Sequence, residues 1–427
     1  MDIHVVRAGE TVSSVAARYG VPAGILAGVN GVAPDAPLAV GQTLVIRHPR
    51  ELHTVASGES VYSIALHYGL SVRTLYQNNP ALGGRSALYP GQTLVIAYDD
   101  TPTRTLAVNA YSYPFIHGGL LDAALPYLTY LTPFTYGINA DGTLLPLADE
   151  WLLAAAGQYR TAALMHLSTL TEEGRFDNAR STLILEDADA QDALVQSILE
   201  TVQARHYFGL DVDFEYVLPE QREAYAAFIT RLREALNPLG CPVIVALAPK
   251  TSAAQRGLLY EAHDYALLGA AANAVFLMTY EWGYAYGPPM AVAPLGQVRA
   301  VLDYALTAVA PEKIFMGIPL YGYDWPLPFV SGETRAESLS PVQAVERALR
   351  HGIAIQYDAA AQAPYYHYTD RGGRKHTVWF EDARSIEAKL RLADEYHLQG
   401  VGYWNLTRPF PQNWAVLASL FDIETLL

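Results

Sequence analysis

The segment Gly209-Leu210-Asp211-Val212-Asp213-Phe214-Glu215 alternates apolar residues with acids. Because side chains point alternately to the two faces of a strand, the acids Asp211, Asp213 and Glu215 are expected on one face. Burying three neighbouring carboxylates is costly, and their mutual repulsion raises the pKa of at least one of them. A carboxylic acid with a raised pKa can act as a general acid near neutral pH. The segment therefore predicts a buried catalytic strand instead of an exposed edge strand.

The same segment resembles the signature Asp-Gly-x-Asp-x-Asp-x-Glu of glycoside hydrolase family 18, a family of chitinases and certain N-acetylglucosaminidases. Phe208 stands where that signature has its leading Asp, a position outside the reacting trio. The resemblance implies a glycosidase in which Glu215 donates a proton to the leaving group.

The composition excludes several other classes of function. Forty-three acids against 28 bases give a formal charge of -15, which repels nucleic acid and anionic lipid surfaces. Apolar runs fall short of the roughly 20 residues of a membrane span, so no membrane insertion is expected. The single cysteine, Cys241, excludes an internal disulfide. Neither metal-ligand spacing nor a phosphate or dinucleotide motif is present, so we expect no metal and no cofactor.

An internal repeat occupies the first hundred residues. Residues 4–16 recur as residues 53–65, and each copy ends with Gly-Gln-Thr-Leu-Val-Ile, at 41–46 and at 91–96. Two short helical patterns lie between these ends, so each copy is predicted to be strand, helix, helix, strand. This arrangement resembles the LysM module, which implies binding to N-acetylglucosamine polymers such as peptidoglycan or chitin. We expect the modules at 1–47 and 52–97.

In LysM modules the sugar lies along the loop after the first strand and the loop before the last. The residues implied by the first of these loops are Gly9, Glu10, Thr11, Gly58, Glu59 and Ser60. The alternative is that the repeat only spaces or solubilises the enzyme. Two tandem copies favour binding, because linked sites gain avidity that a spacer does not need.

Apolar, strand-like runs alternate with helical patterns from Leu106 onward. This alternation predicts an α/β fold, a (β/α)8 TIM barrel over residues 104–427. The gap between the last two runs exceeds one helix and contains further short strands, so a small inserted α+β subdomain is expected at about 324–382, beside the cleft. The eight runs are 106–111, 130–134, 163–167, 208–216, 242–248, 274–280, 314–321 and 400–406.

Active residues of such barrels lie at the carboxyl ends of different strands. The sixth run ends in Met278-Thr279-Tyr280-Glu281, which resembles the family motif Met-x-Tyr-Asp with Glu281 in place of Asp. The resemblance implies that Tyr280 holds the acetamide carbonyl of the substrate and that Trp404 stacks against the sugar ring. Met278 and Glu281 complete the implied sugar-binding set. Further candidates for substrate binding are Asn109, Tyr111 and Tyr321.

The mechanism follows from the placement of the acids. A retaining glycosidase normally uses two carboxylates about 5–5.5 Å apart across the sugar, whereas Asp213 and Glu215 approach from one side. Substrate assistance, in which the N-acetyl oxygen attacks C1, fits better. Glu215 would protonate the leaving oxygen and then activate water. Asp213 would orient the acetamide, Asp211 would set the protonation state of Asp213, and Tyr280 would fix the acetyl oxygen.

Two LysM modules followed by this barrel, with residues 280–284 and 317–322, resemble spore-associated peptidoglycan N-acetylglucosaminidases of endospore-forming bacteria. Residues 166–170 lack the Ser-x-Gly-Gly motif usual in chitinases. We therefore expect cleavage after N-acetylglucosamine in spore cortex, and a spore- or wall-associated protein, although residues 1–4 do not begin a secretory signal. The alternatives are a chitinase and a non-catalytic lectin of the same fold. Lectins of the family typically lack the acid at the position of Glu215.

Overall fold

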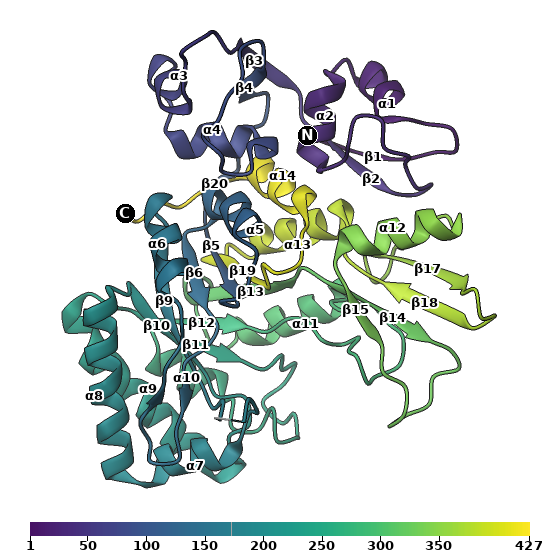
Figure 1. Cartoon of the computed structure of the whole chain (residues 1–427). Helices are drawn as coiled ribbons and strands as arrows, with labels where there is room; N and C mark the ends of the chain where they lie inside the picture. The colour runs from purple at the N-terminus through teal and green to yellow at the C-terminus, as the bar shows by residue number, and fades with distance from the viewer. Residues whose placement is uncertain (172) are drawn as a thin grey trace.

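The computed structural model describes residues 1–171 and 173–427, and its centre is a closed barrel of parallel strands (Figure 1). The barrel closes because β19 pairs with β13 on one side and with β5 on the other. This confirms the predicted (β/α)8 barrel. Around the barrel the strands are β5 (Arg104–Ser112), β6 (Tyr130–Pro133), β9 (Ala162–Ser168), β10 (Gly209–Asp213), β11 (Val243–Leu247), β12 (Ala274–Leu277), β13 (Ile314–Pro319) and β19 (Gly400–Trp404).

Helices cover the outside of the barrel, as their one-sided apolar patterns require. In α9 the apolar face at Tyr225, Phe228, Ile229 and Leu232 is buried. The covering helices are α5 (Gly118–Ala124), α6 (Glu150–Gln158), α7 (Asn178–Glu186), α8 (Ala188–Arg205), α9 (Arg222–Leu236), α10 (Tyr265–Ala271), α11 (Leu295–Ala305), α13 (Ala383–Glu395) and α14 (Pro411–Leu420). Smaller elements are β7 (Gly137–Ile138), β8 (Leu144–Leu145), β20 (Phe421–Ile423) and the 3-10 turns η1 (Pro80–Leu82), η2 (Leu125–Tyr127), η3 (Pro219–Gln221), η4 (Asn237–Leu239) and η5 (Pro311–Lys313).

The N-terminal repeat forms two similar modules, each with one antiparallel strand pair and two helices, as predicted. The first contains β1 (Asp2–Val5), α1 (Val12–Tyr19), α2 (Ala23–Asn30) and β2 (Thr43–Ile46); the second contains β3 (Pro49–Thr54), α3 (Val61–His67), α4 (Val72–Asn78) and β4 (Thr93–Tyr98). Thr11 and Ser60 cap the first helix of each module through a capping box. Both modules lie beside α14 of the barrel (Figure 1).

The insertion between β13 and β19 is a five-stranded antiparallel sheet with one helix. Its strand order is β15-β14-β18-β17-β16. Its first strand begins at Gly322, two residues before the expected start of the insertion. The elements are β14 (Gly322–Pro326), β15 (Glu337–Leu339), α12 (Pro341–His351), β16 (Gln356–Asp358), β17 (Ala363–Thr369) and β18 (Lys375–Trp379).

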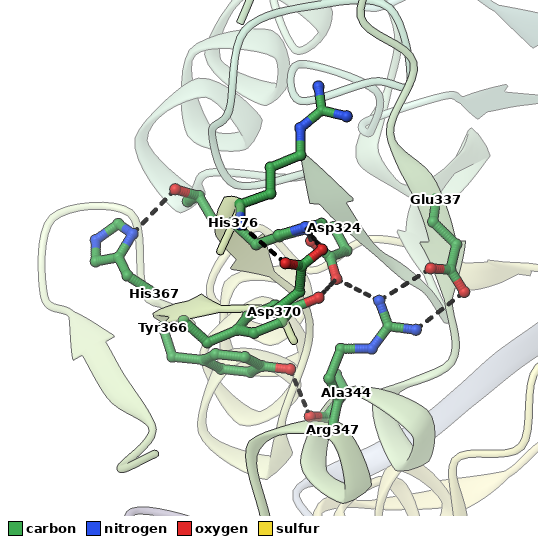
Figure 2. A network of polar contacts seen from close by, with 11 residues as sticks. Asp324, Glu337, Ala344, Arg347, Tyr366, His367, Asp370 and His376 are labelled. Carbon is green, nitrogen blue, oxygen red and sulfur yellow. Dashed lines mark hydrogen bonds and ion pairs between the residues drawn. The ribbon is translucent and has the colours of Figure 1, made fainter. Parts of the chain in front are cut away.

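A buried acid ties α12 to this sheet (Figure 2). The Asp324 carboxylate, on β14, pairs with the Arg347 guanidinium of α12. It also accepts a hydrogen bond from Tyr368 at 2.7 Å and lies 2.8 Å from His376 Nδ1. Arg347 in turn makes two bonds of 2.9 and 3.0 Å to Glu337. A cation and several hydrogen bonds therefore compensate the burial of Asp324.

Within the described residues, no single helix is long and apolar enough to cross a membrane. The pair α1 and α2, bent by 113°, reaches that length and composition only when the two helices are taken together.

Candidate active site

The acids of β10 face the interior of the barrel at its carboxyl end. Phe214 points the other way, where its ring stacks on Tyr225 of α9 with 5.7 Å between ring centroids. The alternation of the strand then turns Asp211 and Asp213 inward, and both are buried. Glu215 is the second residue after the end of β10.

The three carboxylates lack a charged partner of opposite sign. Within the described chain, neither Lys nor Arg forms an ion pair with Asp211, Asp213 or Glu215. His166 Nε2 lies 3.8 Å from Asp213, but burial lowers the pKa of His166 to about 3, so this imidazole is neutral. Tyr111 donates a hydrogen bond of 2.7 Å to Asp211. These carboxylates therefore depend on protonation instead of on ion pairing.

Burial is the largest cause of the raised pKa values of Asp211, Asp213 and Glu215. It raises the pKa of Asp211 to about 7, although the Tyr111 hydroxyl acts in the opposite direction. Burial also raises the pKa of Glu215 to about 7, and the neighbouring Glu281 carboxylate adds to this. The pKa of Asp213 lies well above its ordinary value because of burial, then because of the charges of Glu215 and Asp211. A proton is therefore held at this site near neutral pH.

A cavity of about 140 Å³ brings most of the predicted residues together. Asp213 Oδ1 is buried, and no hydrogen-bond partner for it is found within the described part of the chain. A buried acceptor of this kind fits the amide N–H of a substrate. The predicted residues that line the cavity are Tyr111, Asp213, Glu215, Met278, Tyr280, Glu281 and Trp404.

The remaining candidates lie outside this cavity. Asp211 lies behind it and reaches it through Tyr111. Tyr321 lies behind Glu281, to whose Oε1 its hydroxyl donates a hydrogen bond. Asn109 is buried within the barrel wall, where its side-chain oxygen accepts a 2.8 Å hydrogen bond from Thr132.

Glu281 is held by a residue that the sequence interpretation missed. Tyr323, on β14, donates a 3.0 Å hydrogen bond to the same Glu281 oxygen that accepts from Tyr321. Glu281 has φ of 68°, an uncommon left-handed conformation for a residue other than glycine. Burial raises the pKa of Glu281, while the two tyrosine hydroxyls lower it. The sequence signal that could have identified Tyr323 is its spacing of two residues from Tyr321, which places both side chains on one face of an extended segment after the seventh strand.

A second, wider cavity of about 790 Å³ adjoins the first at Glu215. Glu215, Met278, Tyr280 and Glu281 line both cavities. Glu215 thus lies where the two cavities meet. Lining residues that were not predicted include Tyr216, Thr251, Gln255, Tyr260, Trp282 and Tyr284.

The acids of the LysM loops, Glu10 and Glu59, contact groups of their own modules. Glu10 accepts a 2.8 Å hydrogen bond from the Arg7 amide and lies 2.7 Å from His4 Nε2. The Arg7 amide and His4 together lower the pKa of Glu10 to about 2. Glu59 repeats this arrangement with Ala56 and His53. Both carboxylates therefore shape their loops, whereas Gly9, Thr11, Gly58 and Ser60 are exposed.

No cluster of three or more His, Cys, Asp or Glu side chains that could hold a metal ion occurs among residues 1–171 and 173–427.

Comparisons with known proteins agree with this geometry. Residues 171–408 match the family described as glycosyl hydrolases family 18, and residues 4–47 and 53–97 match the LysM domain. The chain is 39% identical to the cortical fragment-lytic enzyme of Bacillus subtilis (strain 168), over 99% of both chains. The crystal structure of the Bacillus cereus spore cortex-lytic enzyme SleL is similar with a TM-score of 0.84 and 38% identity, covering 99% of this chain and 98% of that one. A chitinase from Chromobacterium violaceum is similar with a TM-score of 0.69 and 26% identity, covering 74% of this chain and 98% of that one.

Proposed function

This chain belongs to glycoside hydrolase family 18, and from that premise we propose that it hydrolyses the bond after N-acetylglucosamine in the peptidoglycan of the spore cortex. The observation that carries the choice of polymer is the similarity to cortical fragment-lytic enzymes over 99% of the chain, with both LysM modules included. The similarity to a chitinase covers only 74% of the chain.

The site geometry supports a substrate-assisted reaction that retains the anomeric configuration. Asp213 ends one strand and Glu215 lies two residues further along the same chain segment, so neither lies across the sugar from the other. A carboxylate nucleophile opposite the proton donor is then missing, and the acetamido oxygen of the substrate can take its place. The substrate must therefore carry a 2-acetamido group, which LysM modules of the family also recognise.

Each group has a defined role in this reaction. Glu215, protonated near neutral pH, gives its proton to the leaving oxygen as the acetamido oxygen bonds to C1. Asp213 accepts the acetamide N–H at its free oxygen and stabilises the positive charge of the cyclic intermediate. Tyr280 donates its hydroxyl to the acetyl oxygen. Glu215, now ionised, then removes a proton from water as that water attacks C1 and opens the ring.

A lectin of the same fold is the less favoured reading. Glu215 is present, is largely buried and has a pKa of about 7, which is the state a general acid needs. A glycan-binding protein without turnover has no use for a protonated acid between two sugar-binding cavities.

We extend the proposal to the place where the protein works. Spore association is supported by its relatives named as cortex-lytic enzymes and by the two LysM modules. Peptidoglycan or another N-acetylglucosamine polymer is the partner that these parts share.

Parallel digestion of spore cortex, vegetative wall and chitin, followed by mass spectrometry of the soluble fragments, tests the proposal. We expect cortex muropeptides with N-acetylglucosamine at the reducing end, released faster than products from the other two polymers. The Glu215→Gln protein is the control for contaminating hydrolases. Faster release of chitobiose from chitin would overturn the choice of peptidoglycan, and reducing-end muramic acid would overturn the choice of bond.

A further inference from the structure

The two LysM modules are alike in sequence but differ in their surroundings. In each, a loop precedes the last strand, residues 31–42 and 79–92, and we call it the closing loop. Gly41 and Gly91 are equivalent in these loops and have φ of 83° and 86°. A Cβ atom added at Gly41 would overlap the Ile355 carbonyl oxygen, whereas one added at Gly91 would meet no described atom within 4 Å. The end of the closing loop is therefore covered in module 1 and open in module 2.

The cover over module 1 is the inserted subdomain. The Ile355 amide, just before β16, donates a 2.8 Å hydrogen bond to the Val40 carbonyl. Ala39 is buried in the same apolar cluster as Tyr366 and α12 of the insertion. Ala39, near the end of the closing loop of module 1, thus forms part of the core of the insertion.

Helix α14 of the barrel holds module 1 from another side. Gln412 Nε2 donates hydrogen bonds of 2.6 Å to the Thr43 carbonyl and 3.0 Å to Asn30 Oδ1. All three residues are buried. Module 1 therefore contacts both the barrel, through Asn30 and Thr43, and the insertion, through its closing loop.

Module 2 is also fixed to the barrel, but through a different surface. Arg73 and Gln77 of α4 donate hydrogen bonds of 2.8 and 2.7 Å to the Pro126 carbonyl. Tyr159 donates a 3.1 Å hydrogen bond to the Gly84 carbonyl, near the start of the closing loop. These contacts leave the end of that loop and the start of α3 exposed.

The exposed part of module 2 carries large side chains that module 1 lacks. Tyr62, two residues after Ser60, is 69% exposed, and Tyr89, two residues before Gly91, is 72% exposed. The equivalent residues of module 1 are Ser13 and Ala39. Two tyrosines are thus presented to solvent beside the two loops along which LysM modules bind sugar.

Tyrosine suits a glycan as ligand. Its ring offers an apolar face to the C–H groups of a pyranose, and its hydroxyl bonds to sugar hydroxyl and acetamido groups. Neither interaction needs a charged residue, which agrees with a neutral N-acetylglucosamine unit. Leu66, one helical turn after Tyr62 and 68% exposed, extends the same apolar surface.

We propose that glycan binding by the N-terminal region belongs to module 2, through Tyr62 and Tyr89, and that module 1 is a brace that holds the insertion against the barrel. The proposal rests on the proposed function only for the identity of the glycan. The brace keeps in place the sheet that carries Tyr323, whose hydroxyl donates a hydrogen bond to Glu281 of the active-site cavity.

Sedimentation of the full chain with insoluble cortex peptidoglycan tests the assignment of binding. The Glu215→Gln background preserves the polymer during the measurement. Replacing the tyrosines by the residues of module 1, in Tyr62→Ser with Tyr89→Ala, is expected to raise the Kd about tenfold or more. An unchanged Kd would overturn the proposal.

A matched pair of substitutions in the two first loops provides the control. Ala8 and Ser57 are equivalent and exposed. Ser57→Arg places a long side chain over the sugar loop of module 2 and is expected to weaken binding, whereas Ala8→Arg leaves the Kd unchanged. An equal rise of the Kd in both variants would show that both modules bind. An unchanged Kd in both would show that module 2 does not bind at this loop. Either result overturns the proposal.

The brace has its own test. Gly41→Ala and Gly91→Ala introduce similar backbone strain, because both glycines have positive φ, but only the first adds the overlap with Ile355. We expect a lower Tm for Gly41→Ala than for Gly91→Ala, and equal Tm values would contradict the brace. Hydrolysis of soluble muropeptides by the chain with Glu215 intact is measured separately. Loss of hydrolysis would contradict the proposed function, whereas the binding and Tm measurements test the roles assigned to module 2 and module 1.

Discussion

The buried carboxylate of the insertion and the buried carboxylates of the barrel cavity differ in whether a cation reaches them. In the insertion, Asp324 pairs with Arg347 and bonds to Tyr368 and His376 (Figure 2). In the barrel, Asp213 and its neighbours have no Lys or Arg partner within the described chain, and their pKa values rise. The insertion uses a buried acid to join a helix to a sheet. Asp211, Asp213 and Glu215 have no such cation among the described residues, so they can take up and release a proton.

Other buried acids of the chain follow the pattern of Asp324. Asp149, at the start of α6, pairs with Arg205 at the end of α8. Glu381 lies 2.8 Å from Lys389 Nζ, and both side chains are buried. Burial alone therefore does not distinguish the acids of the barrel cavity from the structural ones, whereas burial without a cation does.

The largest effect is expected at Glu215. Glu215→Gln keeps the shape of the side chain but removes the transferable proton, so kcat should fall by about 10²- to 10⁴-fold while the protein stays folded. Steady-state hydrolysis of soluble muropeptides measures the loss, and circular dichroism monitors the fold. A folded variant with wild-type kcat would remove Glu215 from the mechanism.

The same substitution at two buried aspartates sharpens the comparison. Asp213→Asn should lower kcat by about 10²- to 10³-fold, because a preorganised charge beside the intermediate is lost. Its Tm should hold or rise, because an unpaired buried acid has been neutralised. Asp324→Asn should leave kcat near that of the wild type and lower stability by about 1–3 kcal/mol, because charge-assisted bonds are lost. Thermal unfolding and kinetics on both variants give the result, and the opposite pairing of effects would refute the distinction.

Much of this molecule could be predicted from its sequence because the determining patterns are local. Strand alternation placed Asp211, Asp213 and Glu215 on one face, and the repeat defined two modules. The contacts made by distant segments could not be predicted. Tyr323 reaches Glu281 only because β14 folds back toward the end of the sixth strand, and Ile355 covers Gly41 only because the insertion folds against module 1. Asn109 sits at a strand end in the sequence, but its side chain bonds to Thr132 of the neighbouring strand.

The smallest effect is expected on pH dependence. Glu215 has a pKa of about 7 in the folded protein, so its acid form, and with it kcat/KM, is lost as pH rises through about 7. The charge of Glu281 helps to raise this pKa, so Glu281→Gln should move the alkaline limb of the profile to lower pH by less than about one unit. The profile reports the coupled carboxylates as a group. An alkaline limb that moves to higher pH would contradict the assignment.

The most direct test of the mechanism is the rate dependence on the nucleophilicity of the substrate's own acetamido oxygen. Aryl glycosides of N-acetylglucosamine bearing acetyl, fluoroacetyl, difluoroacetyl and trifluoroacetyl groups form a series in which fluorine progressively withdraws electrons from that oxygen. Substrate assistance predicts that kcat/KM falls at each step of the series, because the weakened oxygen is the group that attacks C1. A kcat/KM that stays constant across the series would contradict the account and require a nucleophile supplied by the protein or by water.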